Sequence, residues 1–158
     1  RKRGWKKAER AGVLIVTGCK HLPEFWQVLT ENLQRKHGVT PVHTLDEIQL
    51  LARCFPDAIT LVAASVGDRI EAGGLLFRTP VCDHVQYIAS SVRGRQIGAL
   101  DAVFEHCTGA AEKSGKQWFD FGICTEDDGM VLNDGLYRFK SEFGGGGEVY
   151  EIYELNFD

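Results

Sequence analysis

Apolar residues recur along this chain with two different periods, and the change between them divides the chain into elements. A helix is predicted to begin at Pro23 and to end before Gly38, because apolar residues in this stretch recur at spacings of three and four. These apolar positions are Leu22, Phe25, Trp26, Leu29 and Leu33. Thr44 and Glu47 form a capping box that begins a second helix, which Pro56 ends.

The middle of the chain changes to strand patterns. Ile59–Val66 is apolar at both alternating sets of positions, as expected for a central strand covered on both faces. Gly67-Asp68 predicts a two-residue turn into a returning strand at residues 73–77. Residues 81–90 predict a third consecutive strand.

Helical spacing resumes after Gly98 and predicts a helix that stops at Gly115. Residues 118–123 then alternate in polarity and are rich in aromatic residues, which predicts a short strand with Asp120 on one face. Residues 125–129 predict a loop.

The end of the chain predicts one more helix and one more strand. Asn133 or Asp134 can cap a helix that stops at Gly144. One side of this helix carries Leu136, Phe139, Lys140 and Phe143. A last strand or hairpin is predicted from Val149, Ile152, Tyr153 and Leu155.

These patterns predict a single α/β domain over residues 1–158, with a mixed central sheet flanked by helices. The expected order of elements is β-α-α-β-β-β-α-β-α-β. A chain of this length buries about two-thirds of the surface that its unfolded form exposes, so it can fold without a cofactor or disulfides.

Composition and charge narrow the classes of function. The chain is 44% hydrophobic and 25% charged, with a formal net charge of −4, which is typical of a soluble protein and argues against bulk nucleic-acid binding. Residues 1–12 predict a basic lead-in helix before a strand at residues 13–16. Six of the first ten residues are basic, namely Arg1, Lys2, Arg3, Lys6, Lys7 and Arg10.

The cysteines and the single methionine give further expectations about redox state, metal binding and the start of the chain. The five cysteines are widely spaced without a C-x-x-C pair, which indicates neither a zinc site nor a disulfide framework and favours reduced thiols in the cytoplasm. No metal is expected, and no apolar run approaches the roughly 20 residues that span a bilayer. Met130 is the only methionine, so the chain was either trimmed at its start or is one domain of a longer protein.

Residues 93–100 join a strand to a helix and combine basic side chains with glycine. Helix N-termini offer unpaired amides, and glycines let a phosphate approach the backbone, so this segment has the outline of a pyrophosphate cradle. Plain turns between a strand and a helix have the same composition. The candidate cofactor-binding residues are Arg93, Gly94, Arg95, Gln96, Gly98 and Ala99.

Several residues could serve as a general base. The candidates are Asp83, His84, Tyr87, Asp120 and Glu126. Strand alternation places His84 and Gln86 on one face of their strand, and Asp83 and Tyr87 on the other. The alternatives are a structural histidine and carboxylates that serve only solvation or backbone hydrogen bonding. His43, in a loop between two helices, is a candidate contact to a sugar or peptide acceptor.

The order of elements and residues 93–100 together resemble the GNAT acyltransferase superfamily. In that family a Q/R-x-x-G-x-G/A loop holds the pyrophosphate of acyl-CoA; here Arg93 and Gly98 fill the outer positions and Gln96 the middle one. The resemblance implies a GNAT fold, acyl-CoA as the co-substrate, and an acyl pocket lined by the strand that carries His84, Gln86 and Tyr87.

A second resemblance concerns the two ends of the chain. RKRGWKKAERAGVLI and GLYRFKSEFGG look like segments of the second GNAT-like domain of FemABX-type transferases, which form peptidoglycan bridges. That resemblance implies a catalytic lysine at Lys140, which helps to hold the acyl-bearing substrate and offsets developing negative charge, with Phe139 as its positioning neighbour. The residues alone leave open that the Lys140 stem covers apolar surface while its ammonium reaches water.

The sequence as a whole predicts an N-acyltransferase that moves an acyl group from acyl-CoA to an amine on a sugar or cell-envelope precursor. Its partner would be a small-molecule amine acceptor. Two alternatives remain open: a FemABX-type transferase that uses aminoacyl-tRNA, and a catalytically degenerate GNAT-like binding module.

Overall fold

The computed structural model describes residues 2–157, which divide into two compact units between Gly122 and Ile123. The first unit holds most of the secondary structure. Its helices are α1 (Lys2–Arg10), η1 (Cys19–His21), α2 (Leu22–His37), α3 (Leu45–Cys54), α4 (Val92–Ile97) and α5 (Ala99–Lys113). Its strands are β1 (Leu14–Thr17), β2 (Ile59–Val66), β3 (Arg69–Arg78), β4 (Cys82–Ser90) and β5 (Trp118–Asp120).

Local sequence signals set the ends of the helices as expected. Gly38 adopts the left-handed conformation at the C-terminus of α2, with φ of 67°. The capping box at the start of α3 is complete, because the Thr44 hydroxyl accepts from the Glu47 amide while the Glu47 carboxylate accepts from the Thr44 amide. The lead-in helix is confirmed as α1.

The five strands form one mixed sheet in the order β1-β2-β3-β4-β5. The first four are antiparallel neighbours, and the two-residue turn between β2 and β3 is confirmed by the pairing of Val66 with Arg69. β5 runs parallel to β4, which it can do because α4 and α5 return the chain across the sheet. β3 is longer than the strand predicted at residues 73–77.

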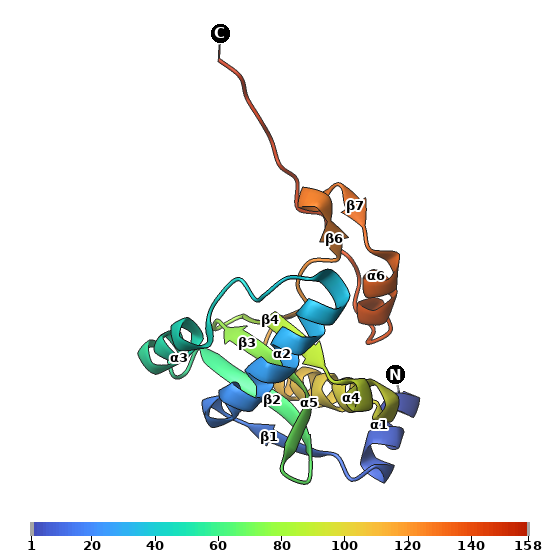
Figure 1. The fold of residues 1–158 in the computed structure, drawn as a ribbon. Helices are drawn as coiled ribbons and strands as arrows, with labels where there is room; N and C mark the ends of the chain where they lie inside the picture. Colours follow the sequence, from blue (N-terminus) through green and yellow to red (C-terminus); the bar gives the residue numbers. More distant parts are fainter. Residues whose placement is uncertain (1, 158) are drawn as a thin grey trace. The chain divides into compact units, whose positions relative to one another are not determined.

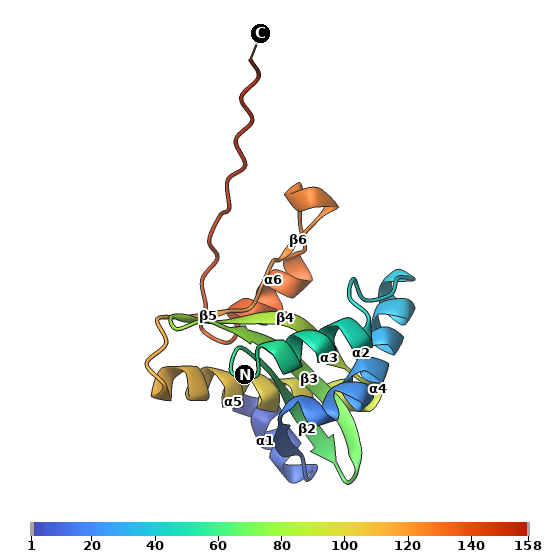
Figure 2. The same cartoon turned by 90° about the vertical axis from the view of Figure 1, so that its left-hand side faces the viewer.

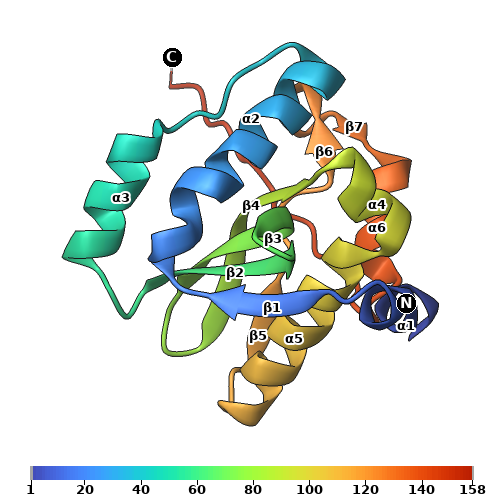
Figure 3. The same ribbon diagram turned by 60° about the horizontal axis from the view of Figure 1, so that its bottom comes forward.

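Helices cover both faces of this sheet (Figures 2 and 3). α2 and α3 lie on one face, where Phe25, Leu29 and Ile48 pack on alternate residues of β2 such as Leu61. α5 lies on the other, and its Val103 approaches Val85 of β4 across Gly74. α1, α4 and α5 lie together at one side of the unit (Figure 1). The expected α/β class with a mixed sheet is confirmed.

Two strand irregularities affect which side chains face the helices. The β3–β4 register shifts so that Leu75 pairs with Tyr87 but Leu76 pairs with Val85, which leaves Gln86 as an extra residue in β4. A similar shift between β2 and β3 leaves Glu71 as the extra residue in β3.

The second unit is small. It contains β6 (Thr125–Glu126), η2 (Asp127–Gly129), β7 (Val131–Leu132) and α6 (Asp134–Ser141). The predicted loop at residues 125–129 is therefore half of a short hairpin, because Thr125 pairs with Leu132. Asn133 caps α6 by accepting from the Leu136 amide at 2.9 Å, which confirms one of the two predicted caps.

The predicted last strand is wrong for the part of the chain that the structure describes. Residues 144–157 have no helix or strand, and their apolar side chains are exposed. Val149 and Ile152 are 83% and 90% exposed, so little of either side chain is buried. A strand pattern forms a strand only where a neighbouring strand satisfies its backbone groups, and none of the described strands pairs with this segment.

Two further findings bear on the expectations from composition. All five cysteines are free thiols. None of the helices in residues 2–157 is long and apolar enough to cross a membrane.

Candidate active site

The candidate site lies at the point where β4 and β5 stop pairing. β5 pairs with β4 only from Cys82 to His84, whereas β4 continues to Ser90. His84 and Asp120 are partners in the last pair of this short ladder. Their side chains meet there, with 2.7 Å between His84 Nδ1 and Asp120 Oδ2.

The Asp120 side chain is held at both oxygens. Its Oδ1 accepts a hydrogen bond from the Gly122 amide at 2.7 Å, while Oδ2 faces His84. An ionised carboxylate only accepts hydrogen bonds, so this contact places the ring proton of neutral His84 on Nδ1. The other ring nitrogen, Nε2, then carries a lone pair that can accept a proton. Both side chains are more than one-third exposed, so a solute can reach them.

A second contact joins β4 to the loop between α2 and α3. Tyr87 Oη lies 2.6 Å from His43 Nδ1 and accepts from the His43 amide at 3.3 Å. The Tyr87 ring also packs edge-on against Trp26 of α2, with 5.3 Å between ring centroids. This contact fixes His43, one of the sequence-predicted acceptor contacts, beside β4.

The predicted face of Tyr87 is wrong. Simple alternation places Tyr87 with Asp83, but Tyr87 contacts α2 whereas Val85, two residues earlier, points toward α5. The extra residue at Gln86 causes the change, because a bulge shifts the alternation by one position. His84 and Tyr87 therefore both project away from the α5 face. Gln86 itself is half-buried at the bulge.

Asp83 is a buried carboxylate that is paired with cations. It is buried on the α5 face, where its two oxygens accept from Arg78 Nε and Nη2, each at 3.1 Å. Lys116 Nζ lies 3.5 Å from the same carboxylate. Two cations therefore compensate its buried charge, and this arrangement does not favour a role as a base.

The predicted cofactor-binding segment, residues 93–99, is mostly helical rather than a loop, with Gly98 as the left-handed turn between α4 and α5. Residues 92–97 form α4, which the Ser91 hydroxyl caps by accepting from the Gly94 amide at 2.8 Å. The Ser91 hydroxyl in turn donates to the buried Glu71 carboxylate, and Arg93 Nη1 lies 3.5 Å from the same carboxylate. The Glu71 carboxylate therefore lies beside the N-terminus of α4.

The two glycines of this segment allow the backbone of the chain itself to approach. A Cβ on Gly94 would collide with the Glu71 carbonyl, and one on Gly98 would lie 2.6 Å from the Gly4 carbonyl of α1. Ala99 is also buried, whereas Gln96 is exposed. These two glycines are therefore explained by close packing of the chain on itself. Arg95 is exposed, and its Nη1 donates to Asn32 Oδ1 of α2 at 3.2 Å.

Three other predicted site residues belong to the second unit. Lys140 is buried, and its ammonium donates to the Ile123 carbonyl at 2.6 Å. Phe139 packs edge-on against Phe143, with 5.4 Å between ring centroids. Glu126 is exposed and accepts from Asn133 Nδ2 at 2.6 Å. Each of the three side chains contacts another residue of the second unit. These contacts do not test the catalytic or binding roles expected from the sequence.

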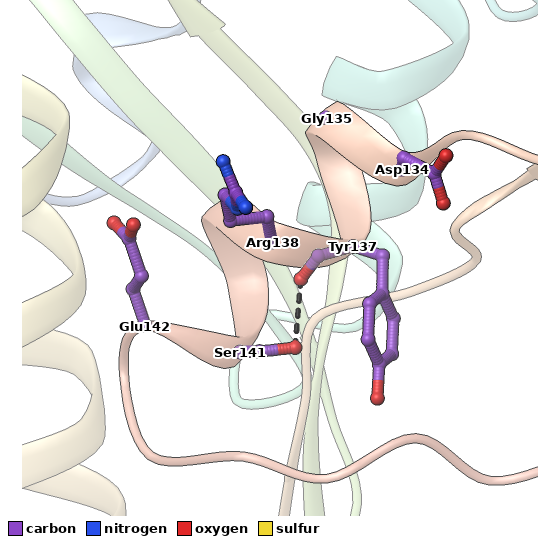
Figure 4. A pocket seen from close by; sticks show the side chains of 6 residues that line it. All are labelled: Asp134, Gly135, Tyr137, Arg138, Ser141 and Glu142. Carbon is purple, nitrogen blue, oxygen red and sulfur yellow. Dashed lines mark hydrogen bonds between the residues drawn. The ribbon is translucent and has the colours of Figure 1, made fainter.

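A surface groove lies along α6 (Figure 4). It is lined by Asp134, Gly135, Tyr137, Arg138, Ser141 and Glu142. Ser141 donates to the Tyr137 carbonyl at 2.8 Å, so its hydroxyl serves the helix. Five of the six residues come from α6 and the sixth, Glu142, is its C-cap, and most of them are exposed. The groove is therefore an open helix surface and not a converging site.

The structure thus brings together two pairs of predicted residues, His84 with Asp120 and His43 with Tyr87. Sequence reasoning missed Glu71 and Ser91, which fix α4. Glu71 could have been noticed as the acid inside an otherwise apolar stretch, IEAGGLLF. Ser91 could have been noticed as a helix cap three residues before Gly94.

Comparison with known proteins bears on the fold. The profile described as an Acetyltransferase (GNAT) domain matches residues 1–141. A search of curated proteins gave no match. Three solved structures are similar along 92% of this chain.

The first of these structures is a protein described as a possible acetyltransferase from Clostridium difficile 630, with a TM-score of 0.70, 11% identity and 98% of that chain covered. The second is an aminoglycoside acetyltransferase from an uncultured soil metagenomic sample, in complex with trehalose, with a TM-score of 0.65, 13% identity and 97% covered. The third is AAC(6')-Iy in complex with a CoA-containing bisubstrate analogue, with a TM-score of 0.63, 10% identity and 98% covered. At these identities the likeness concerns the fold.

Proposed function

The chain belongs to the GNAT acetyltransferase family, and on that premise we propose that it transfers an acyl group from acyl-CoA to an amine on a sugar or cell-envelope precursor. The observation that carries the proposal is the contact between His84 and Asp120 at the end of the β4–β5 ladder. It provides a positioned base at an accessible point where two parallel strands separate.

In the proposed reaction, the acceptor amine attacks the carbonyl carbon of the thioester and the C–N bond forms as the C–S bond breaks. The amine nitrogen loses a proton during this attack, and His84 Nε2 accepts it. Asp120 keeps the other ring proton on Nδ1 and stabilises the imidazolium that results. CoA leaves as its thiolate, which takes the proton from the His84 imidazolium and so becomes the thiol product.

Tyr87 and His43 are proposed to serve the same reaction from the neighbouring part of β4. Their contact of 2.6 Å holds the α2–α3 loop, which would border the acceptor. The Tyr87 hydroxyl is a second group that can exchange a proton, because it shares a hydrogen bond with an imidazole nitrogen. Gln86, at the bulge between the two pairs, is the proposed amide contact to substrate.

Lys140 is proposed to offset the negative charge that develops on the thioester oxygen, with Phe139 as its positioning neighbour. This role comes from the resemblance of GLYRFKSEFGG to the FemABX pattern. A cation aimed at such an oxygen lowers the barrier to acyl transfer. Glu126 is the weakest of the proposed bases, since its carboxylate already accepts from Asn133.

The donor and acceptor can be tested together. The full chain is incubated with acetyl-CoA and a panel of amino sugars, and acetylated products are detected by mass spectrometry, because exposed Cys54 would complicate detection with thiol reagents. We expect at least one acetylated amino sugar, and we expect His84→Gln to abolish its formation. His106→Gln, which removes an exposed histidine from α5, is the matched control and should retain activity. Failure of the wild-type chain to acetylate any amine, together with no binding of acetyl-CoA in calorimetry, would overturn the proposal.

A second candidate donor is aminoacyl-tRNA, and one observation favours it. Arg3, Lys6, Lys7 and Arg10 of α1 are all exposed, so the lead-in helix presents several cations to a polyanion. Binding of charged tRNA that weakens steeply with added salt, with transfer of its aminoacyl group, would favour this donor over acyl-CoA. Binding of uncharged and charged tRNA with equal affinity and no transfer would count against it.

A further inference from the structure

Trp118 is an exposed aromatic residue on the same strand as Asp120. It is the first residue of β5, which is the last strand in the order of the sheet, and it is 63% exposed. The other two tryptophans of the chain, Trp5 and Trp26, are 40% and 7% exposed. Burial of a large aromatic side chain is favourable, so an indole that is left in solvent beside an accessible acid–base pair has surface available to a ligand.

Strand alternation places Trp118 on the face of the sheet where the proposed base lies. Phe119 points to the α5 face, because its ring packs edge-on against Phe104 of α5 with 6.4 Å between ring centroids. Trp118 and Asp120, on either side of Phe119, therefore project to the opposite face. His84 projects to this face too, since its ring meets the Asp120 carboxylate.

The pairing of β4 with β5 sets the distance between Trp118 and the base. Trp118 pairs with Cys82 and Asp120 pairs with His84, so these are successive pairs on one face. The Cys82 thiol lies near Asp120 as well, because burial and then the charge of Asp120 raise the pKa of this thiol. The Trp118 amide donates to the Val81 carbonyl at 3.1 Å, which fixes the start of β5. Two residues along a strand amount to about 7 Å, which is close to the length of one hexosamine.

We propose that the indole of Trp118 binds the sugar ring of the acceptor and so places the acceptor amine at His84. This role for Trp118 deepens the proposed function and rests on it for the identity of the reacting amine. One face of a pyranose ring carries mainly C–H groups, which pack on the flat apolar surface of an indole and exclude water from both. The Asp120 carboxylate gives the same surface a negative charge, which attracts an amino sugar in its ammonium form.

Glucosamine is the probe, titrated into the full chain by calorimetry without acyl-CoA, so that no turnover occurs. We expect Trp118→Ala to lower the affinity at least about tenfold, and Trp118→Phe, which keeps a flat apolar ring, to lower it less than about threefold. Circular dichroism of each variant checks that it is folded, as expected for an exposed position.

Trp5→Ala is the matched control, because it removes a second exposed tryptophan, from α1. It should bind glucosamine within about twofold of the wild type. Absence of glucosamine binding to the wild type, or equal affinities of Trp118→Ala and the wild type, would overturn the proposed role of Trp118.

Turnover distinguishes the Trp118 contact from the proposed function. With acetyl-CoA present, Trp118→Ala should raise KM for glucosamine at least about tenfold and change kcat less than about threefold, because the ring contact is the same in the ground state and the transition state. A fall in kcat at unchanged KM would contradict the role in binding. His84→Gln should keep its affinity for glucosamine and lose turnover. If the wild type acetylates no amine while Trp118→Ala still loses affinity for glucosamine, the proposed function fails and the sugar contact stands.

Discussion

The Asp120 carboxylate meets the His84 ring across the last pair of the β4–β5 ladder, with 2.7 Å between Oδ2 and Nδ1. The second oxygen of Asp120 is fixed by the Gly122 amide. This double attachment orients the carboxylate and, through it, the ring. The relationship depends on the parallel pairing of two strands that are 36 residues apart at this contact.

Asp120→Asn should stop His84 Nε2 from acting as the proposed base without disturbing the fold. The amide oxygen of Asn replaces Oδ1 at Gly122, so its NH₂ group faces His84 Nδ1 and donates to it. The ring proton then moves to Nε2, which can no longer accept a proton from the amine. We expect kcat to fall by about 100-fold or more while the melting temperature changes little. A variant that keeps activity within threefold of the wild type would show that Asp120 does not orient the base.

Lys140→Met tests the role of the buried lysine in the second unit. Methionine keeps much of the apolar stem but removes the ammonium that donates to the Ile123 carbonyl. If the ammonium offsets developing charge, kcat falls at least about tenfold while KM for the donor changes little. Thermal unfolding, measured in parallel, reports the structural contribution of the contact. Unchanged kcat in a folded variant would leave Lys140 with a structural role alone.

Gly94→Ala should destabilise the fold because α4 packs directly on β3. The added Cβ would collide with the Glu71 carbonyl, a backbone atom that cannot turn away, and overpacking of this kind costs about 1–3 kcal/mol. Gly109→Ala is the matched control, since Gly109 lies in α5 with open space around its Cα. That substitution should stabilise the chain by about 0.5–1 kcal/mol. Denaturant unfolding of both variants measures the difference, and a mild effect at Gly94 would contradict the close packing of α4.

The capping box of α3 should make stability depend on pH. Hydrogen bonds from the Thr44 amide and hydroxyl lower the pKa of Glu47 from its usual value of 4.5. A lowered pKa in the folded state means that the stabilisation is present above pH 4.5 and is lost as the pH falls through the folded-state value. Glu47→Gln should therefore lower the melting temperature at pH 7, and this difference should shrink in acid.

Thr44→Val provides the control for that measurement, because it removes the hydroxyl of the box. In this background the effect of Glu47→Gln at pH 7 should be smaller. A pH-independent effect of Glu47→Gln in the wild-type background would contradict the assignment.

Much of the fold is predictable from the sequence, because its signals are local. The turn at Gly67-Asp68 and the capping box of Thr44 and Glu47 depend on residues within a few positions of one another. Periodicity likewise identified α2 and β2, because burial of one face requires apolar residues at fixed spacings. The same reasoning failed for residues 149–155, where the pattern of a strand is present and a pairing partner is not.

The candidate site was predicted only in its parts. His84, Asp120, His43 and Tyr87 were all named from the sequence as residues able to bind or exchange protons. The pairing of these residues could not be predicted from the sequence, because it depends on the register between strands and on the position of the α2–α3 loop. The face of Tyr87 was also beyond local reasoning, because one extra residue at Gln86 reverses the alternation.

The amino-acid sequence by itself determined the chemistry that is available and the elements that carry it. Tertiary structure decided which groups meet: Ser91 reaches the Glu71 carboxylate across 20 residues, and Arg95 reaches Asn32 across 63. The physical reason is that helix caps and apolar periodicity are satisfied within a few residues of the chain. Charges and buried polar groups instead find their partners on distant elements, which only the packing of the chain places beside them.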